Sequence, residues 1–223
     1  KISDAEIQIQ RKLANLPPHD LRRKINIVAI DDQDFPPENN LRNSGFSIQL
    51  LNDITNVSQI ENFQIILCDL NDIGMDLSPD SQGAYVIEEI KSKYPEKVVI
   101  AYTAASLNSK LLNKARQTAD AYVKKDISID KWRDILDEQI KLLANPIHTW
   151  KAERIRLMDL GMELQELIPI EQAFLRNIFK DKESLTQAIN AEIEKIEPPS
   201  WAAEVSRFLL SKSLDFAIAY ITK

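Results

Sequence analysis

Cysteine, histidine and glycine are scarce in this sequence, and each scarcity excludes a class of site. The one cysteine, Cys68, cannot form an internal disulfide, and its place in an apolar run favours a core position in a reducing compartment. Two histidines, His19 and His148, are too few for a histidine-rich metal hydrolase and do not favour a Ser-His-Asp enzyme. No glycine-rich loop ends in Gly-Lys-Ser/Thr, which excludes a P-loop nucleotide hydrolase.

Long apolar runs and an excess of positive charge are also missing. No window approaches the roughly 20 apolar residues of a membrane span, and the N-terminus lacks a signal-peptide pattern. The net charge of -6, from 28 basic and 34 acidic residues, argues against a general electrostatic hold on nucleic acid or an anionic membrane. We therefore expect a cytoplasmic globular protein; because the sequence begins without methionine, we also allow for an upstream domain that it omits.

From residue 25 to residue 145, short apolar runs alternate with segments of helical period. The predicted strands are Ile25–Ile30, Ser47–Leu51, Gln64–Cys68, Lys97–Tyr102 and Ala121–Lys124. The predicted helices between and after them are Val57–Asn62, Ala84–Tyr94, Leu107–Ala119 and Asp130–Ala144. Continuous apolar strands separated by helices predict an α/β fold, a five-stranded doubly wound parallel sheet covered on both faces.

The segments on either side of this region are predicted to be helical. Ser3 and Glu6 have the spacing of a capping box, and Pro17-Pro18 ends the helix that they begin. After Pro146 no strand pattern remains, and the predicted helices, separated at Pro169 and at Pro198-Pro199, are Thr149–Leu167, Ile170–Phe179, Lys182–Ile196 and Trp201–Ile221. The chain thus divides into an N-terminal helix and linker (1–24), an α/β domain (25–146) and an all-α C-terminal domain (147–223).

Four of the predicted strands deliver polar residues to one edge of the sheet. Asp31 and Asp32 follow the first strand, Asp69 the third, Thr103 the fourth and Lys125 the fifth. Ligands bind at this edge in open parallel sheets, and three carboxylates that converge there need a cation, for which Mg²⁺ is the expected ion. A carboxylate nucleophile can then attack a phosphoryl group, while an ammonium group neutralises the transferring oxygens.

Residues 25–145 resemble the receiver domain of two-component response regulators. The residues that carry the resemblance are Asp31-Asp32, Asp69, Asn71, Thr103-Ala104 and Tyr122-Val123-Lys124-Lys125. The resemblance implies a flavodoxin-like fold that binds Mg²⁺ directly through Asp32 and mostly through water at Asp31. It also implies Asp69 and the backbone carbonyl of Asn71 as further ligands.

The same resemblance implies a signalling cycle. Asp69 is the phosphoacceptor, which takes phosphate from a histidine kinase or from the phosphotransfer protein of a phosphorelay. Thr103 and Lys125 then move toward the phosphoryl group, and Tyr122 is the signalling aromatic that swings inward.

Three departures from the family pattern stand out. Pro36-Pro37 falls where the first receiver helix normally starts, so we expect that helix to be late and short. The loop from Leu70 to Gly83 is long, and we expect its extra acidic residues, Asp72, Asp76 and Asp80, to face water. Lys125 is followed by Asp126 where the family usually has proline, which predicts a different aim of the lysine side chain.

We prefer a phosphorylated response regulator whose C-terminal helices bind a protein partner or associate as a homodimer. A haloacid-dehalogenase-type phosphatase would normally carry a second aspartate where this chain has Asn71, so we expect no enzyme beyond the receiver's own phosphorylation and dephosphorylation. The alternative is a non-phosphorylated pseudo-receiver that serves as a scaffold. A DNA-binding regulator is less favoured, because the C-terminal charges do not form an evident basic face.

Overall fold

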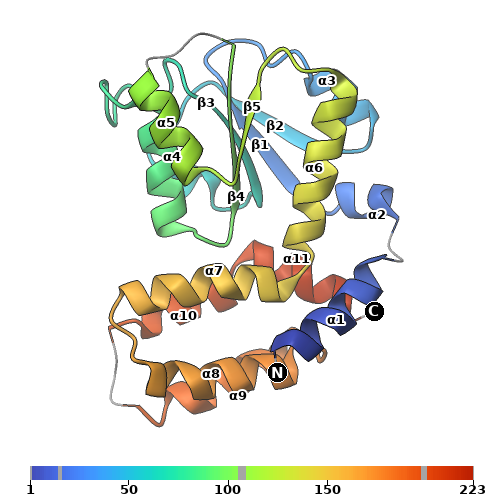
Figure 1. Ribbon diagram of the computed structural model, residues 1–223, viewed down its shortest axis with the longest axis vertical. Helices are drawn as coiled ribbons and strands as arrows, with labels where there is room; N and C mark the ends of the chain where they lie inside the picture. The colour runs from blue at the N-terminus through green and yellow to red at the C-terminus, as the bar shows by residue number, and fades with distance from the viewer. Residues whose placement is uncertain (1, 15–16, 105–108, 197–199, 223) are drawn as a thin grey trace. The chain divides into compact units, whose positions relative to one another are not determined.

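The computed structural model describes residues 2–14, 17–104, 109–196 and 200–222, and the chain divides into two compact units (Figure 1). The sheet unit covers Pro17–Ile140, and the helical unit combines the N-terminal segment up to residue 16 with residues from 141 onward. The N-terminal segment therefore belongs to the same unit as the last third of the chain. No helix in the described ranges is long and apolar enough to cross a membrane.

Five parallel strands form the centre of the sheet unit. They are β1 (Asn26–Ile30), β2 (Ser47–Leu51), β3 (Ile65–Asp69), β4 (Val98–Thr103) and β5 (Ala121–Lys124). Their spatial order is β2-β1-β3-β4-β5, which confirms the predicted five-stranded doubly wound parallel sheet. Every strand boundary lies within one residue of the predicted one. The strand order reverses between β1 and β3, and ligands bind outside the carboxyl ends of the strands at such a switch point.

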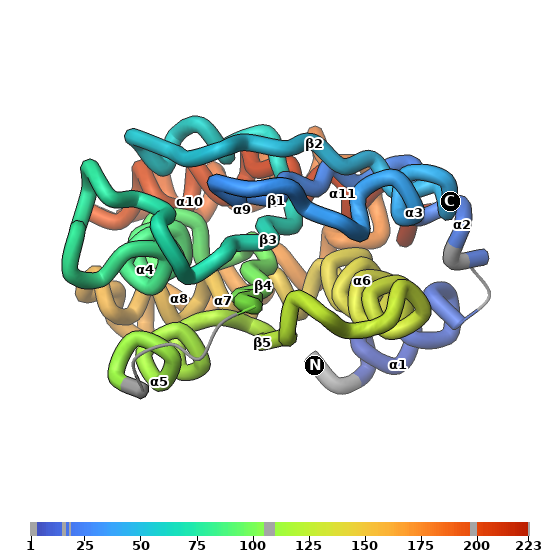
Figure 2. The backbone as a smooth tube through the Cα atoms, turned by 90° about the horizontal axis from the view of Figure 1, so that it is seen from above, coloured from blue at the N-terminus to red at the C-terminus, as the bar shows by residue number. Residues whose placement is uncertain are grey.

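Helices cover both faces of this sheet. In the sheet unit they are α2 (Pro18–Arg22), α3 (Glu38–Asn43), a 3-10 turn η1 (Val57–Ile60), α4 (Gln82–Lys93), α5 (Ser109–Thr118) and α6 (Ile129–Leu143). Within this unit α4 and α5 lie on one side of the strands, and α3 and α6 lie on the other (Figure 2). Leu107, where one predicted helix began, lies outside the described residues.

The two faces of the strands supply two apolar layers. Val28, Cys68 and Ala101 belong to the layer under η1, α4 and α5, and all are fully buried. Cys68 is therefore a core residue, as predicted. The opposite layer includes Phe35, Tyr102 and Trp132 of α6, whose rings contact one another.

The first helix after β1 is late and short, as predicted. α3 has six residues and begins after Pro37, because proline lacks the N–H that a helix interior requires. Its buried residue is Leu41, which is 0% exposed. Gly45, with φ +91°, then turns the chain into β2 through a conformation that favours glycine.

The elements described after residue 146 are all helices, which confirms the predicted all-α character of this region. The helices of the helical unit are α1 (Ile2–Ala14), α7 (Pro146–Asp159), α8 (Leu164–Asn177), α9 (Lys182–Ile193), α10 (Ala202–Leu209) and α11 (Lys212–Ile221). The indole of Trp150 stacks on Phe174, with ring centroids 4.8 Å apart. Ala5 and Ile9 bring α1 into the same core.

Several helix boundaries differ from the prediction. α1 spans Ile2–Ala14, so Ser3 lies inside the helix that it was predicted to begin. The helix predicted to run to Leu167 ends at Asp159, where Gly161 adopts φ +91°. Pro169 does not separate helices, since it lies inside α8, whose buried Ile170 and Phe174 continue the core face beyond it.

The last predicted helices are also corrected at their ends. The helix predicted to end at Ile196 stops at Ile193. The single helix predicted to begin at Trp201 is two helices, because the side chain of Ser211 accepts a hydrogen bond from the backbone N–H of Leu214 and caps α11. Pro198-Pro199 lies outside the described residues.

Candidate functional site

The strand-end residues of the sheet unit meet at one edge. Asp31 and Asp32 follow β1, and Asp69 ends the neighbouring strand β3. One carboxylate oxygen from each of these three aspartates lies within 4.8 Å of the others, and we call them the acidic cluster. Asp31 and Asp69 are 3% and 4% exposed, whereas Asp32 is open to solvent. The sequence-predicted carboxylates therefore lie together, as the order of the strands requires.

Three hydrogen-bond donors hold the Asp69 carboxylate. Its Oδ1 accepts hydrogen bonds from the backbone N–H groups of Leu70 (2.6 Å) and Asn71 (3.3 Å), and its Oδ2 accepts one from Lys125 Nζ (3.2 Å). Burial raises the pKa of Asp69, and the negative charge of Asp31 adds to this, although the Asn71 amide and Lys125 oppose it. Burial therefore disfavours the ionised form of Asp69, and a nearby cation would favour it.

Lys125 bridges two members of the acidic cluster. Its Nζ lies 2.8 Å from Asp31 Oδ2 and 3.2 Å from Asp69 Oδ2, and its side chain is 11% exposed. Burial acts to lower the pKa of Lys125, but the hydrogen bonds to Asp31 and Asp69 outweigh it and raise the pKa. Lys125 is therefore the ammonium group of this site, while Lys124 is exposed to solvent.

The backbone at Lys125 is fixed although Asp126, and not proline, follows it. The backbone N–H of Lys125 donates to the carbonyl of Thr103 at 2.9 Å, which holds the start of the loop after β5 against the end of β4. Lys125 Nζ reaches both Asp31 and Asp69 with Asp126 after it. That Asp126 changes the aim of this lysine relative to the family stays a prediction.

Thr103 is linked to the site through Asn71. The Asn71 Nδ2 donates to Thr103 Oγ1 at 3.4 Å, and Thr103 is 2% exposed. Ala104, the next residue, is exposed. The backbone N–H of Asn71 bonds Asp69 while its side chain bonds Thr103, so Asn71 connects the hydroxyl to the acidic cluster.

This donor set suits a magnesium ion. Mg²⁺ takes oxygen ligands and usually keeps several waters beside one or two carboxylates. Asp31 and Asp69 offer buried carboxylate oxygens, and Asp32 offers one that faces solvent. A cation beside the buried Asp69 carboxylate would also offset the desolvation of its charged form. The backbone carbonyl of Asn71, two residues after Asp69, is the further ligand that the resemblance implies.

Two contacts of the site were not predicted from the sequence. Tyr102 donates its hydroxyl to Asp31 Oδ2 at 2.8 Å, and burial together with Asp31 raises the pKa of this phenol far above its ordinary value. A Cβ atom on Gly83, at the start of α4, would meet the carbonyl oxygen of Asp69 at 2.1 Å. The sequence held one sign of the Tyr102 contact, since Tyr102 is the bulky phenol in a strand of otherwise small and aliphatic residues.

Backbone contacts and one buried side chain anchor the long loop after β3. The backbone N–H of Gly74 donates to Asp53 Oδ1 at 2.7 Å, and Ile73 is fully buried. The three extra acidic residues are exposed, as predicted, and they are Asp72, Asp76 and Asp80.

Tyr122 lies in β5 and makes none of the hydrogen bonds to Asp31, Asp32 or Asp69 that are described above. Its ring is partly buried against the layer under α4 and α5, and the guanidinium carbon of Arg116 lies 4.4 Å from its centroid. Its signalling role stays a prediction.

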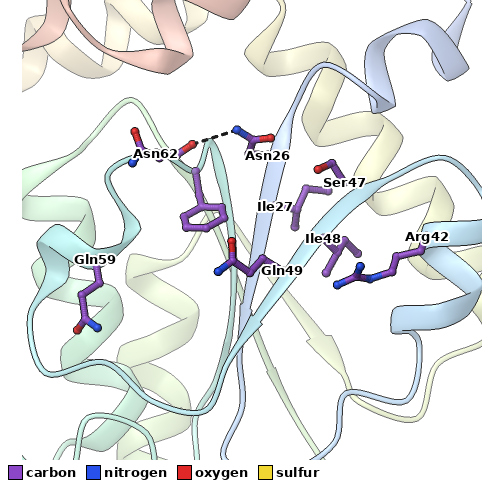
Figure 3. Close-up of a pocket in the computed structure, with 9 residues that line it drawn as sticks. Asn26, Ile27, Arg42, Ser47, Ile48, Gln49, Gln59 and Asn62 are labelled. Atoms are coloured by element: carbon purple, nitrogen blue, oxygen red, sulfur yellow. Dashed lines mark hydrogen bonds between the residues drawn. The ribbon is translucent and has the colours of Figure 1, made fainter.

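A pocket of about 610 Å³ lies at the opposite end of the strands (Figure 3). Asn26 and Ser47, which begin β1 and β2, line it, and Asn26 Nδ2 donates to the carbonyl of Asn62 at 3.4 Å. The remaining lining residues are Ile27, Arg42, Ile48, Gln49, Gln59 and Phe63. The acidic cluster is not part of this pocket.

Comparison with known proteins returns receiver domains. No protein-family model matches the chain, and no curated protein matches it either. A CheY-like receiver domain protein from Methanospirillum hungatei JF-1 is 18% identical, with a TM-score of 0.44, and the match covers 52% of this chain and 93% of that one. A response regulator from Thermotoga maritima is 15% identical, with a TM-score of 0.42, and the match covers 52% of this chain and 97% of that one.

The Vibrio cholerae chemotaxis protein CheY4 gives a similar result, with 15% identity, a TM-score of 0.41, and coverage of 51% of this chain and 97% of that one. At such identities the similarity concerns the fold only. The strand order β2-β1-β3-β4-β5, with α3 and α6 opposite α4 and α5, is by itself that of a flavodoxin-like doubly wound sheet.

Proposed function

We propose that this protein is a cytoplasmic response regulator in which Mg²⁺-dependent phosphorylation of Asp69 controls a protein interaction of the helical unit. One observation carries the proposal. Lys125 bonds both Asp31 and Asp69 at the carboxyl edge of the sheet. Beside them, the Asn71 side-chain amide donates a hydrogen bond to the Thr103 hydroxyl. A lysine, a hydroxyl and three carboxylates at this edge are the parts that phosphoryl transfer to a carboxylate requires.

The proposed reaction uses the groups already in place. An Asp69 carboxylate oxygen attacks the phosphorus atom of a phosphohistidine, an O–P bond forms, and the N–P bond breaks as the imidazole leaves and takes a proton. Lys125 shifts its hydrogen bonds from the carboxylates to the transferred oxygens, and the Thr103 hydroxyl donates to another. Bound Mg²⁺ supplies charge neutralisation on these oxygens.

The partners follow from this chemistry. The donor is a histidine kinase or a phosphotransfer protein, and the output is contact of the helical unit with another protein or with a second copy of this chain. We propose no activity on an external substrate, only the phosphorylation and dephosphorylation of Asp69 itself.

Intact-mass measurement of the full chain with Mg²⁺ and acetyl phosphate tests the proposal. We expect one added phosphoryl group, which disappears in Asp69→Asn and after chelation of the metal. Asp72→Asn is the matched control, because Asp72 is an exposed acid on the loop that follows Asp69. Phosphorylation of Asp72→Asn should equal that of the wild type, and no adduct at saturating donor in any variant would contradict the proposal.

A non-phosphorylated scaffold is the second candidate, and the burial of Asp69 favours it. Only 4% of Asp69 is exposed and Lys125 already bonds it, so a donor must displace protein contacts to reach it. For this candidate the same incubation leaves the mass unchanged, while partner binding by the helical unit is insensitive to Asp69→Asn.

A further inference from the structure

Tyr102 connects the acidic cluster to the opposite side of the sheet. It precedes Thr103 in β4 and pairs with Asp69 of β3. Successive strand residues face opposite sides, so Tyr102 points toward α6 while Thr103 points away from it. Although the residue is 0% exposed, its hydroxyl reaches Asp31 Oδ2 at 2.8 Å. Ile30 offers a second acceptor, its carbonyl, but at 3.4 Å.

Three donors hold the Asp31 carboxylate. The backbone N–H of Gln33 donates to Oδ1 at 3.1 Å, Tyr102 donates to Oδ2, and Lys125 lies within 2.9 Å of both oxygens. Lys125 is shared with Asp69, so its bonds to Asp31 weaken whenever it turns toward another anion. Tyr102 is then the remaining side-chain donor among those that hold Asp31 here. A hydrogen bond to an ionised acceptor is stronger than one between neutral groups.

Behind Tyr102 lies a set of three rings, Phe35, Tyr102 and Trp132, which we call the aromatic triad. The Trp132 ring stands edge-on to Tyr102 with centroids 5.8 Å apart, and Phe35 lies 5.4 Å from each of the other two. Each member is at most 3% exposed. Close-packed interiors transmit small displacements to neighbouring side chains. A shift of the Tyr102 ring must therefore be felt by Trp132 on α6.

We propose that Tyr102 is a positioning residue that fixes Asp31 for cation binding and, through the aromatic triad, couples the state of the acidic cluster to α6. The inference rests on the proposed function only in that a cation binds at the acidic cluster. It adds a route on the α6 side of the sheet, separate from Tyr122, which packs on the other side. Groups that orient a metal ligand typically change metal affinity by about 10- to 100-fold when removed.

The test measures Mg²⁺ binding by calorimetry and the ¹⁹F spectrum of the full chain labelled with 5-fluorotryptophan. The chain has three tryptophans, and Trp132→Phe identifies the resonance of Trp132. Tyr102→Phe keeps the ring and removes the hydroxyl, and circular dichroism verifies its folding. Tyr85→Phe is the matched control, because Tyr85 lies on α4, which covers the other face of the sheet.

In the wild type we expect Mg²⁺ to shift the Trp132 resonance. In Tyr102→Phe we expect Mg²⁺ affinity to fall about tenfold and the shift at saturation to be reduced, while Tyr85→Phe retains both. Unchanged affinity in a folded Tyr102→Phe protein, or a Trp132 resonance that ignores Mg²⁺ in the wild type, would overturn the inference.

The two proposals can fail separately. A wild-type protein that binds Mg²⁺ in a Tyr102-dependent way but accepts no phosphoryl group contradicts the proposed function and leaves the role of Tyr102 standing. Phosphorylation of Asp69, together with Mg²⁺ binding that does not depend on Tyr102, supports the proposed function and contradicts the role of Tyr102. Absence of Mg²⁺ binding contradicts both.

Discussion

Replacing Lys125 by an uncharged side chain of similar size tests how much its positive charge stabilises the fold. Its ammonium group bonds two nearly buried carboxylates, so Lys125→Met leaves Asp31 and Asp69 in mutual repulsion. We expect the metal-free variant to lose about 1–3 kcal/mol of unfolding free energy, because unpaired buried charges carry a desolvation cost. Urea unfolding with and without Mg²⁺ measures this, and added Mg²⁺ should recover part of the loss.

Lys124→Met is the control for this change. Lys124 is adjacent and exposed, so its replacement should alter the unfolding free energy by less than about 0.5 kcal/mol. Equal losses in the two variants would show that Lys125 does not neutralise the acidic cluster.

The raised pKa of Asp69 predicts a pH-dependent effect of Asp69→Asn. A group whose pKa is raised by folding stabilises the native state below its unfolded pKa and loses that contribution as the pH rises through the folded pKa. Asparagine does not titrate, so in metal-free buffer Asp69→Asn should be more stable than the wild type near neutral pH, by roughly 1 kcal/mol. The difference should vanish as the pH falls below the ordinary value of 3.8.

Thermal melts of both proteins across this pH range, in the presence of a chelator, make the comparison. Asp72→Asn, which removes an exposed acid on the loop after Asp69, is the control variant. A wild type that is more stable than Asp69→Asn at neutral pH would mean that Lys125 and the backbone amides neutralise Asp69 fully.

At the scale of elements, the first turn of α4 sets how the end of β3 is held. A Cβ on Gly83 would lie 2.1 Å from the carbonyl oxygen of Asp69 and 2.8 Å from Leu70 Cα, both backbone atoms. Gly83→Ala must therefore displace α4 or the site, and we expect a loss of about 1–3 kcal/mol or more together with weaker Mg²⁺ binding. Chemical unfolding and calorimetry measure the two effects.

Gly161→Ala separates this clash from the general cost of replacing glycine. Gly161 has φ +91° but nothing within 4 Å of its Cβ position, so only the left-handed backbone is penalised, by about 1–2 kcal/mol. It lies in the helical unit and should leave Mg²⁺ binding unchanged. A Gly83→Ala protein that binds Mg²⁺ normally would refute the close approach.

The elements also show where sequence reasoning ends. Four of the strands were predictable as short apolar runs that lead into a polar residue, whereas β2 is mixed, with Ser47 and Gln49 in it. Asp69, Thr103 and Lys125 were found from their order along the chain. The Tyr102 hydroxyl bond and the Gly83 contact were not, since both depend on which strand residue faces which helix. Pro169 was misjudged because the helical core face around Ile170 outweighs one missing backbone bond.

At the scale of the whole molecule, α1 belongs to the core of the helical unit, although the sequence separates it from α7 by the entire sheet. Ile9 is 0% exposed in that core, and Ile7, two residues earlier, is 53% exposed. Ile9→Ala should therefore cost about 2–5 kcal/mol of the stability of the helical unit, whereas Ile7→Ala should cost little. Hydrogen exchange resolves the two units, and we expect faster exchange in α7 and α11, which contact α1.

Equal protection of the helical unit in Ile9→Ala and Ile7→Ala would contradict the packing of α1. The sequence did not predict that α1 packs against α7 and α11. The periodicity of an amphipathic helix shows that one face is buried, but it does not identify the element that buries it.

Phosphorylation of Asp69, as we propose it, is open to one direct measurement. The full chain is treated with Mg²⁺ and acetyl phosphate, the acyl phosphate is reduced with borohydride, and the product is located by peptide mass spectrometry. We predict homoserine at position 69 and unmodified Asp31, Asp32 and Asp72. Reduction at another acidic residue, or at none under saturating donor, would contradict it.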